Sequence, residues 1–174
     1  MTLSQLTQIV YNRFVNRPLV EAINNTFADY EINTPLRQSH FLAQIIHESA
    51  AFCYTKEIAS GAAYEGRIDL GNIHPGDGIR YKGRGYIQLT GRANYTKLSA
   101  FLGRDFLKQP ELLEALPYAM LAAGWYWDAH KLNLLADLDD VEKITRKING
   151  GLNGFADRKN WLAKCKEVLI EKKA

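Results

Sequence analysis

Apolar residues recur every three or four positions along most of the chain, which is the spacing of helices that bury one face. Prolines suited to first turns, side chains suited to N-caps and glycines suited to helix ends mark where these helices begin and stop. The pattern predicts a mainly α protein. The expected helices start near Leu3, at Pro18, at Thr34–Pro35 (to about Phe52), after Thr90–Gly91 (to Gly103), at Pro117, at Asp139 or Asp140 (to Asn149), and around Trp161.

One stretch breaks the helical pattern. Glycine is dense between Gly61 and Gly85, and the sequence Pro75-Gly76-Asp77-Gly78 excludes a regular helix there. We expect one long irregular loop or a small hairpin, and loops of this length are usually functional. The helices then form two lobes of a single domain, residues 1–174, which flank a groove with the loop at its rim.

The composition excludes several classes of protein. The chain has 174 residues, of which 47% are hydrophobic and 24% are charged, as in ordinary globular proteins. No run approaches the roughly 18 apolar residues of a membrane span, and the N-terminus lacks the features of a signal peptide. The net charge is only +3, and most basic residues are scattered. We therefore expect a monomer that is cytoplasmic as synthesised and binds neither membrane nor nucleic acid.

Motifs for metals and cofactors are incomplete. His47-Glu48 begins a zinc signature, but Ala51 stands where the second histidine ligand would be. No glycine-rich segment completes a dinucleotide or phosphate-loop pattern. Cys53 and Cys165 are expected to be buried reduced thiols rather than a disulfide. The sequence therefore predicts no metal site and no cofactor.

Glu48 lies on the apolar side of the third expected helix, at helical spacing from Phe41, Ile45 and Phe52. An apolar surrounding favours the neutral form of a carboxyl group, which a general acid needs. The competing interpretation is a structural glutamate paired with an arginine. A second glutamate, Glu57, favours the catalytic interpretation, because glycosidic bonds are hydrolysed by two carboxyl groups in unlike surroundings.

Glu57 can cooperate with Glu48 only if the helix ends near Phe52 and the chain then folds back. Continuous helix between the two glutamates would separate them by about 13.5 Å and place them on opposite faces. A separation of about 6.5–9.5 Å would leave room for a water and give inversion of configuration. Glu65 and Asp77 are alternative candidates for the base.

Polar side chains gather where the loop meets the next helix: Gln88, Thr90, Asn94 and Tyr95. Amide, hydroxyl and phenol groups of this kind are suited to binding sugars. Thr90 alone is most simply an N-cap, although its hydroxyl could also orient a water. Asn149, ahead of two glycines, fits a helix C-terminus, and its amide could also hold an N-acetyl group.

Several blocks, in this order, resemble the family 19 glycoside hydrolases. The family includes plant-type chitinases and, more similar to this chain, phage endolysins and bacterial chitinase-like proteins. The resemblance implies a lysozyme-like, two-lobed helical fold with an active-site groove. The blocks run from about Phe41 to Trp161 and include His47-Glu48-Ser49, the segment from Tyr81 to Thr90, Asn94-Tyr95 and Ile148-Asn149-Gly150-Gly151.

The resemblance also implies roles for single positions. Glu48 resembles the general acid, Glu57 the general base, and Thr90 the hydroxyl residue that helps to hold the water. The interval between the two glutamates is shorter than in plant enzymes, and the extra substrate loops of those enzymes are not evident, which argues against long chitin chains. Positions similar to substrate-binding residues are His47, Arg84, Tyr86, Gln88, Asn94, Tyr95 and Asn149.

We therefore predict an endo-acting, inverting hydrolase of β-1,4-linked N-acetylhexosamine glycans. The expected substrate is peptidoglycan, in an endolysin- or lysozyme-like role. One alternative is a chitinase acting on chitin oligomers, and another is a non-catalytic cell-wall-binding protein, which would not need Glu48, Glu57 and Thr90. The protein would reach the wall through a holin-like pore or another export route.

Overall fold

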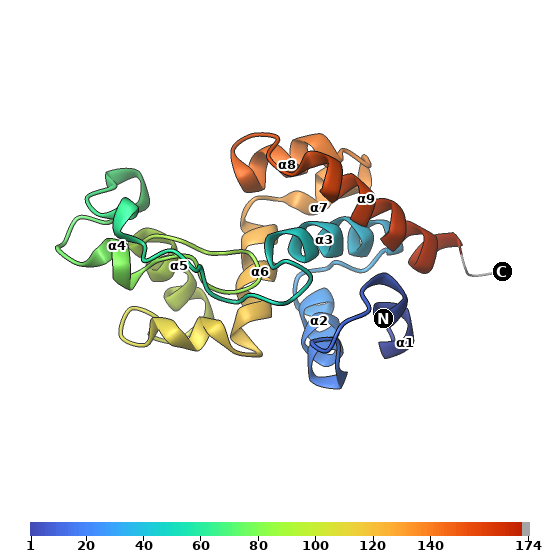
Figure 1. Cartoon of the computed structure of the whole chain (residues 1–174), viewed down its shortest axis with the longest axis horizontal. Helices are drawn as coiled ribbons and strands as arrows, with labels where there is room; N and C mark the ends of the chain where they lie inside the picture. Colours follow the sequence, from blue (N-terminus) through green and yellow to red (C-terminus); the bar gives the residue numbers. More distant parts are fainter. Residues whose placement is uncertain (172–174) are drawn as a thin grey trace. The chain divides into compact units, whose positions relative to one another are not determined.

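The computed structural model describes residues 1–171, with side chains described up to residue 170. The chain divides into two compact units. Unit 1 contains Met1–Cys53 and the chain from Gly124 onward, and unit 2 contains Tyr54–Ala123. The fold is mainly helical, as the sequence predicted (Figure 1).

The helices of unit 1 begin and end at residues suited to these positions. Thr34 Oγ1 accepts the N–H of Arg37 at the start of α3, and the Asp140 side chain accepts that of Lys143 at the start of α8. Gly150 ends α8 in the left-handed conformation. The helices are α1 (Leu3–Ile9), α2 (Arg17–Asp29), α3 (Pro35–Glu48), the second part of α6 (Tyr118–Ala129), α7 (Leu132–Asp137), α8 (Val141–Asn149) and α9 (Phe155–Lys166), followed by the π-helical turn η4 (Glu167–Glu171).

Helix α3 lies in the core of unit 1, where it packs against α9, α7 and η4 (Figure 1). Phe41, near its middle, is fully buried, and its ring meets those of Phe27 and Trp127 edge-on at centroid distances of 5.9 and 5.4 Å. Burying one such side chain stabilises a fold by about 1.5–3 kcal/mol. This packing fixes the helix that carries Glu48.

Helix α3 ends at Glu48, earlier than the predicted end near Phe52. Ala50, Ala51 and Phe52 all adopt left-handed backbone conformations, with φ of 48°, 59° and 66°. The turn is held by Ser49, whose hydroxyl donates to the carbonyl of Ile45 and accepts the N–H of Phe52. The chain therefore turns directly after Glu48, as cooperation between the two glutamates requires.

Unit 2 contains the irregular stretch that the sequence predicted, but the expectation that Pro75-Gly76-Asp77-Gly78 excludes a helix was wrong, because the short helix α4 (Asp77–Arg80) begins within it. The small-hairpin alternative is not supported, because the part of the chain that the structure describes has only isolated antiparallel bridges here, Lys56–Arg84 and Arg84–Leu89. Gly103 ends α5 in the left-handed conformation, as expected. The helices of unit 2 are η1 (Ala62–Tyr64), η2 (Ile68–Leu70), α4 (Asp77–Arg80), α5 (Arg92–Leu102), η3 (Pro110–Glu114) and the first part of α6.

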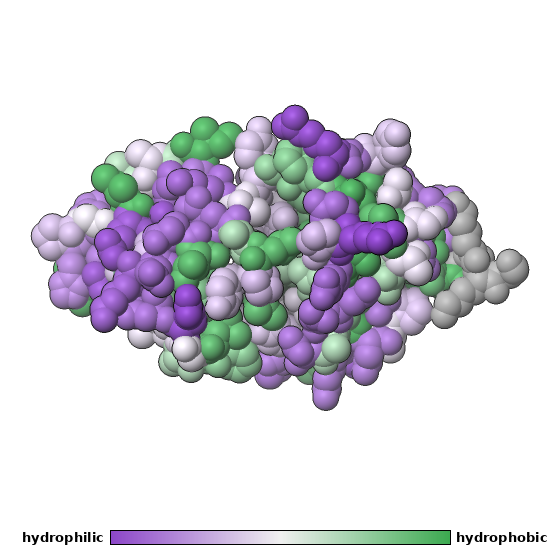
Figure 2. All heavy atoms as spheres, turned by 90° about the horizontal axis from the view of Figure 1, so that it is seen from below, coloured by the Kyte–Doolittle hydropathy of each residue, from purple (hydrophilic) through white to green (hydrophobic). Residues whose placement is uncertain are grey.

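The face shown in Figure 2 is mostly hydrophilic over the part that carries α4 and α5, with hydrophobic residues in small groups. Within residues 1–171, no helix has the length and apolar character needed to cross a membrane. Both cysteines are free thiols. Cys165 is buried as predicted, and burial raises its pKa, whereas Cys53 is exposed because it lies beyond the end of α3.

Candidate active site

Glu48, the last residue of α3, is held by a buried arginine from α9. Arg158 Nη2 donates to Glu48 Oε1 at 2.5 Å, and Arg158 Nη1 donates to Gln44 Oε1 at 2.5 Å. Gln44 in turn donates to Thr145 Oγ1 at 3.4 Å. The side chain of Arg158 is 1% exposed, whereas that of Glu48 is 19% exposed. The network fixes one carboxyl oxygen and leaves Glu48 Oε2 without a hydrogen bond from the described residues.

The surroundings of Glu48 are more polar than the apolar face that the sequence predicted. Phe41 and Ile45 are buried in α3 as expected, but Phe52 lies beyond the helix. The structure contains the arginine pair that was the competing interpretation. It does not exclude catalysis, because Glu48 keeps an oxygen and part of its surface outside that pair.

His47, next to Glu48, belongs to a second polar network. Its Nδ1 lies 2.6 Å from Asp157 Oδ2, which also accepts the indole N–H of Trp161 at 3.1 Å. The ring of His47 lies against Gly154, where a Cβ would come within 2.2 Å of its Cε1 atom. His47 is therefore held by α9 and by the turn before it, and its side chain is 24% exposed, so the predicted substrate contact is sterically open.

Two other polar residues of unit 1 bear on the site. Burial raises the pKa of Tyr126, and the charge of Glu48 raises it further, so Tyr126 stays a neutral phenol whose hydroxyl donates to the carbonyl of Lys147 at 3.0 Å. Asn149 is exposed at the end of α8, the C-terminal position that its glycine neighbours predicted. Its sugar contact stays a prediction.

In unit 2, both oxygens of Glu57 accept hydrogen bonds. The hydroxyl of Tyr64 donates to Oε1 at 2.9 Å, and the N–H of Gly83 donates to Oε2 at 3.1 Å. Burial, with the hydrogen bond to Glu57 and its charge, raises the pKa of Tyr64, which keeps this donor protonated. Glu57 itself is half-buried. The carboxylate is thus oriented without being enclosed.

Gln88 lies beside this carboxylate. A Cβ added to Gly83 would be 2.9 Å from Gln88 Oε1 and 3.3 Å from Glu57 Oε2, so both groups surround the same glycine. Thr90 Oγ1 donates to the carbonyl of Gln88 at 2.9 Å, and Asn94 Nδ2 donates to the carbonyl of Thr90 at 2.8 Å. Gln88, Thr90 and Asn94 are therefore brought together as the sequence predicted.

The N-cap interpretation of Thr90 was wrong. Helix α5 begins at Arg92, its N-cap position is Gly91, and no side chain caps it. Gly91 has φ of 92°, a conformation open to glycine, so the chain enters the helix one residue after Thr90. The hydroxyl of Thr90 therefore does not cap the helix. It donates a hydrogen bond within the turn, and its oxygen can still accept one from a ligand.

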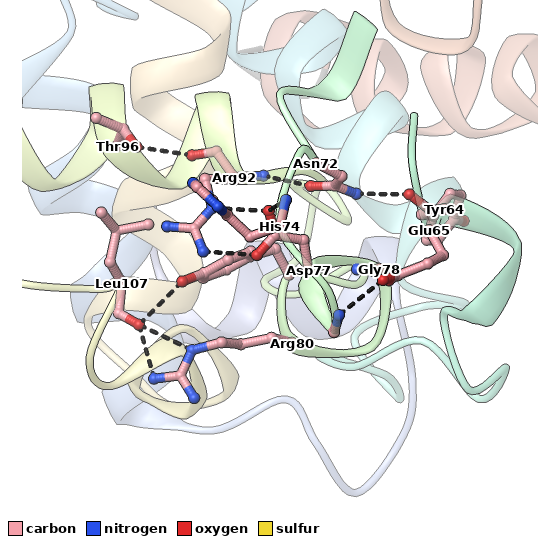
Figure 3. Close-up of polar contacts among 12 residues, drawn as sticks. Tyr64, Glu65, Asn72, His74, Asp77, Gly78, Arg80, Arg92, Thr96 and Leu107 are labelled. Atoms are coloured by element: carbon pink, nitrogen blue, oxygen red, sulfur yellow. Dashed lines mark hydrogen bonds and ion pairs between the residues drawn. The ribbon is translucent and has the colours of Figure 1, made fainter. Parts of the chain in front are cut away.

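The two alternative bases both have structural partners. Glu65 accepts the N–H group of Gly76 at 2.7 Å and that of Gly78 at 2.8 Å, and Figure 3 shows the second of these bonds. Asp77 is 1% exposed and accepts a two-point ion pair from Arg92, whose hydrogen bonds hold the pKa of Asp77 below its usual range. These contacts hold the loop together, and the choice of Glu57 as the base stays a prediction.

Three residues that were predicted to contact the sugar are buried within unit 2. Tyr95 is fully buried, donates its hydroxyl hydrogen to the carbonyl of Lys82 at 2.7 Å and accepts Arg84 Nη1 at 3.1 Å. Burial raises the pKa of Tyr95 to about 12. Arg84 and Tyr86 are each 7% exposed. The sequence could not reveal this, because these residues adjoin Gly83 and Gln88 along the chain, while the folded structure buries most of their side chains.

Sequence reasoning missed Arg158, Gln44, Asp157 and Tyr64. Each is a supporting partner of a predicted residue. Arg158 and Asp157 lie 110 residues from Glu48 and His47. Only the expected arginine partner of Glu48 signalled such a contact, and nothing in the sequence distinguished Arg158 from the other arginines.

Known proteins share this fold. Chitinase C from Streptomyces griseus HUT6037 superposes with a TM-score of 0.78 at 23% identity, covering 97% of this chain and 76% of that one. A class IV chitinase from Zea mays gives a TM-score of 0.74 at 20% identity, covering 96% of this chain and 90% of that one. At these identities the likeness establishes the fold alone, which is that of a chitinase-type protein.

Sequence relatives give the family. The model of the family described as chitinase class I, glycoside hydrolase family 19, matches residues 39–137. A glycosyl hydrolase family 19 domain-containing protein of Haemophilus influenzae is 34% identical over 154 residues, which cover 71% of this chain and 75% of that protein. An endochitinase of Arabidopsis thaliana is 36% identical over 140 residues, but the match spans only 48% of its length. The chain belongs to glycoside hydrolase family 19.

Proposed function

We propose that the protein is an endo-acting hydrolase that cleaves β-1,4 bonds between N-acetylhexosamine units with inversion of configuration. The observation that carries the proposal is that two carboxyl groups of this family 19 chain are both held by hydrogen bonds and both partly exposed. Glu48 and Glu57 are each oriented by hydrogen bonds within their own unit, and each keeps partial access to solvent. An acid and a base that act on a bound glycan need both properties.

Glu48 is the proposed general acid. In its protonated form it donates a proton to the glycosidic oxygen while the bond from that oxygen to the anomeric carbon breaks. Arg158, at 2.5 Å, then stabilises the carboxylate that the transfer leaves behind. The second carboxyl oxygen, Oε2, is the one available to meet the leaving oxygen.

Glu57 is the proposed general base. Its carboxylate takes a proton from a water whose oxygen forms the new bond to the anomeric carbon. Tyr64 and Gly83 hold the carboxylate from one side, which fixes its orientation. Gln88 lies next to it, and Thr90 contacts the main chain of Gln88, so both are candidates for holding the water. Exchange of protons with solvent restores both glutamates for the next cycle.

The stereochemical outcome tests this mechanism. Attack by water from the face opposite the leaving group should give the α-anomer as the first product of a β-linked substrate. Proton NMR recorded during the first turnovers, before mutarotation, measures it. The β-anomer as first product would contradict a base role for Glu57 and would indicate a covalent or substrate-assisted route.

Thr90 gives a second test. Thr90→Ala removes one hydrogen bond to Gln88, so the free energy of unfolding should fall by only about 0.5–1.5 kcal/mol. If the hydroxyl holds the water, kcat should drop by roughly tenfold or more while glycan binding barely changes, because only the transition state loses the contact. Thr90→Ser retains the hydroxyl and should preserve kcat. A folded Thr90→Ala protein with undiminished kcat would restrict Thr90 to stabilising the turn.

Peptidoglycan is the proposed substrate, and chitin oligomers are the second candidate, favoured by relatives that are named endochitinases. Mass spectrometry of fragments released from purified peptidoglycan and from chitin oligomers decides between them, and the new reducing ends identify the bond. Cleavage of chitin alone would favour the second candidate. Wall binding by folded protein without any release would favour a non-catalytic module. Delivery through a holin-like pore or another export route is part of the peptidoglycan proposal.

A further inference from the structure

Unit 2 contains a hollow of about 580 Å³ whose chemistry differs from that of the glutamate site. Glu57 and Gln88 are not among the described residues that line it. Its walls combine three guanidinium groups with one carboxylate and apolar side chains. The groups used below are Arg80, Arg84, Arg92, Asp77 and Ile79. We call this feature the arginine hollow.

Two of the guanidinium groups are held in place by the protein (Figure 3). Arg80 donates from Nε and Nη2 to the carbonyl of Leu107, at 3.1 and 2.9 Å. Arg92 donates from Nε and Nη2 to the two carboxylate oxygens of Asp77, at 2.8 and 2.6 Å. In both arginines, Nη1 makes no hydrogen bond with a residue that the structure describes. The Nη1 group of each of these two arginines can therefore donate hydrogen bonds to a ligand.

The third arginine is almost completely buried. Arg84 is 7% exposed, and it donates from Nε to Glu114 at 2.8 Å and from Nη1 to Tyr95 at 3.1 Å. Its Nη2 makes no hydrogen bond within the described part of the chain, but this atom is not sealed from solvent. Because the Arg84 side chain lines the hollow, solvent or a ligand there can accept a hydrogen bond from Nη2.

The charges of the arginine hollow are only partly neutralised. Arg84 and Arg92 each contact a carboxylate, but the hydrogen bonds of Arg80 end on main-chain carbonyls. The guanidinium carbons of Arg80 and Arg92 lie 5.9 and 4.9 Å from the ring centroid of Tyr81, which restricts both side chains further. Arginines already ordered in this way lose little conformational entropy when they bind an anion.

We propose that the arginine hollow is an anion-binding site that takes a phosphate or carboxylate group. Guanidinium groups match the oxygen geometry of both anions. Ile79 is 58% exposed and gives the hollow an apolar wall, which suits an anion carried on a short aliphatic or sugar unit. A chitin chain carries no anionic group, so such a site goes beyond chitin hydrolysis. Peptidoglycan carries carboxylates on its lactyl and peptide groups, and to the extent that these are the ligands, the inference rests on the proposed substrate.

Titration of the protein with two probes tests the proposal and separates the two anions. Inorganic phosphate and N-acetyl-D-alanine are added separately, at an ionic strength held constant with sodium chloride, and backbone amide resonances are followed by NMR. We expect saturable shifts at Gly76, Gly78, Arg80 and Arg92 with at least one probe. The probe with the higher affinity identifies the preferred anion.

Arg80→Gln should weaken the binding of that probe by about tenfold or more, as expected for loss of a hydrogen bond to a charged group. Lys97→Gln is the matched control, because it removes one exposed positive charge from α5 at a position outside the lining of the hollow. Its affinity should stay near that of the wild type. Ile79→Glu keeps all three arginines but adds a carboxylate at the hollow, and it should also weaken binding.

Shifts that do not saturate, shifts centred elsewhere, or equal losses in Arg80→Gln and Lys97→Gln would overturn the proposal. Arg80, Ile79 and Lys97 are all exposed, so the variants should retain the wild-type pattern of resonances. Because the titration involves no hydrolysis, its failure is distinguishable from failure of the proposed enzymatic function.

Discussion

Glu48→Gln is expected to lower turnover of a β-1,4-linked N-acetylhexosamine glycan by at least about 10²–10⁴-fold, the contribution of general acid catalysis. Glutamine keeps an oxygen that can accept the hydrogen bond from Arg158, but its amide has no proton to give at neutral pH. The measurement is kcat on soluble oligomers, from the rate at which new reducing ends appear. Near-normal turnover would contradict the mechanism.

The same substitution leaves Arg158 buried beside a neutral group. Removing one partner of a buried ion pair typically costs about 3–5 kcal/mol. The loss should be smaller here, because glutamine retains an acceptor and the Glu48 side chain is 19% exposed. Glu142→Gln is the matched control. Glu142 pairs with Arg146 on an exposed face of α8, so its replacement should change both stability and turnover little.

Glu57→Gln is expected to lower kcat by a similar factor of about 10²–10⁴, because the amide cannot accept a proton from the attacking water. Glutamine keeps one oxygen for the Gly83 N–H, and the Tyr64 hydroxyl can accept a hydrogen bond from the amide NH2 group, so binding of the glycan should change much less than turnover. Separate values of kcat and of the dissociation constant for an oligomer are the measurement.

Glu65→Gln distinguishes the two candidate bases. Glu65 accepts the N–H groups of Gly76 and Gly78, so its replacement should destabilise the loop by about 1.5–3 kcal/mol. Turnover per folded molecule should be retained. If Glu65→Gln abolishes turnover and Glu57→Gln does not, the base is Glu65.

Much of the local structure was readable from the sequence. The start of α3 at Thr34, the start of α8 at Asp140 and the stops at Gly103 and Gly150 follow from hydrogen bonds and backbone preferences within a few residues. The irregular stretch in unit 2 follows from its glycines and prolines in the same way. These features depend on neighbours in the chain, and so their signals are local.

The end of α3 could not be predicted from local sequence signals. Ala50, Ala51 and Phe52 carry no sign of a left-handed turn, since only glycine adopts it without strain. A contact from far along the chain helps to hold it: the Asn12 amide donates to the carbonyl of Ala51 at 2.8 Å. Predicting the helix to continue therefore followed the local preferences, and the tertiary structure overrode them.

The sequence by itself determined which residues are candidates for chemistry: two glutamates, a hydroxyl and a set of amides in a recognisable order. The tertiary structure decided what surrounds each of them. It placed Arg158 on Glu48, assigned Glu65 and Asp77 to the loop, and turned Tyr95 into the core. The physical reason is that hydrogen bonds and ion pairs depend on distance in space, whereas sequence patterns report only positions along one helix or turn.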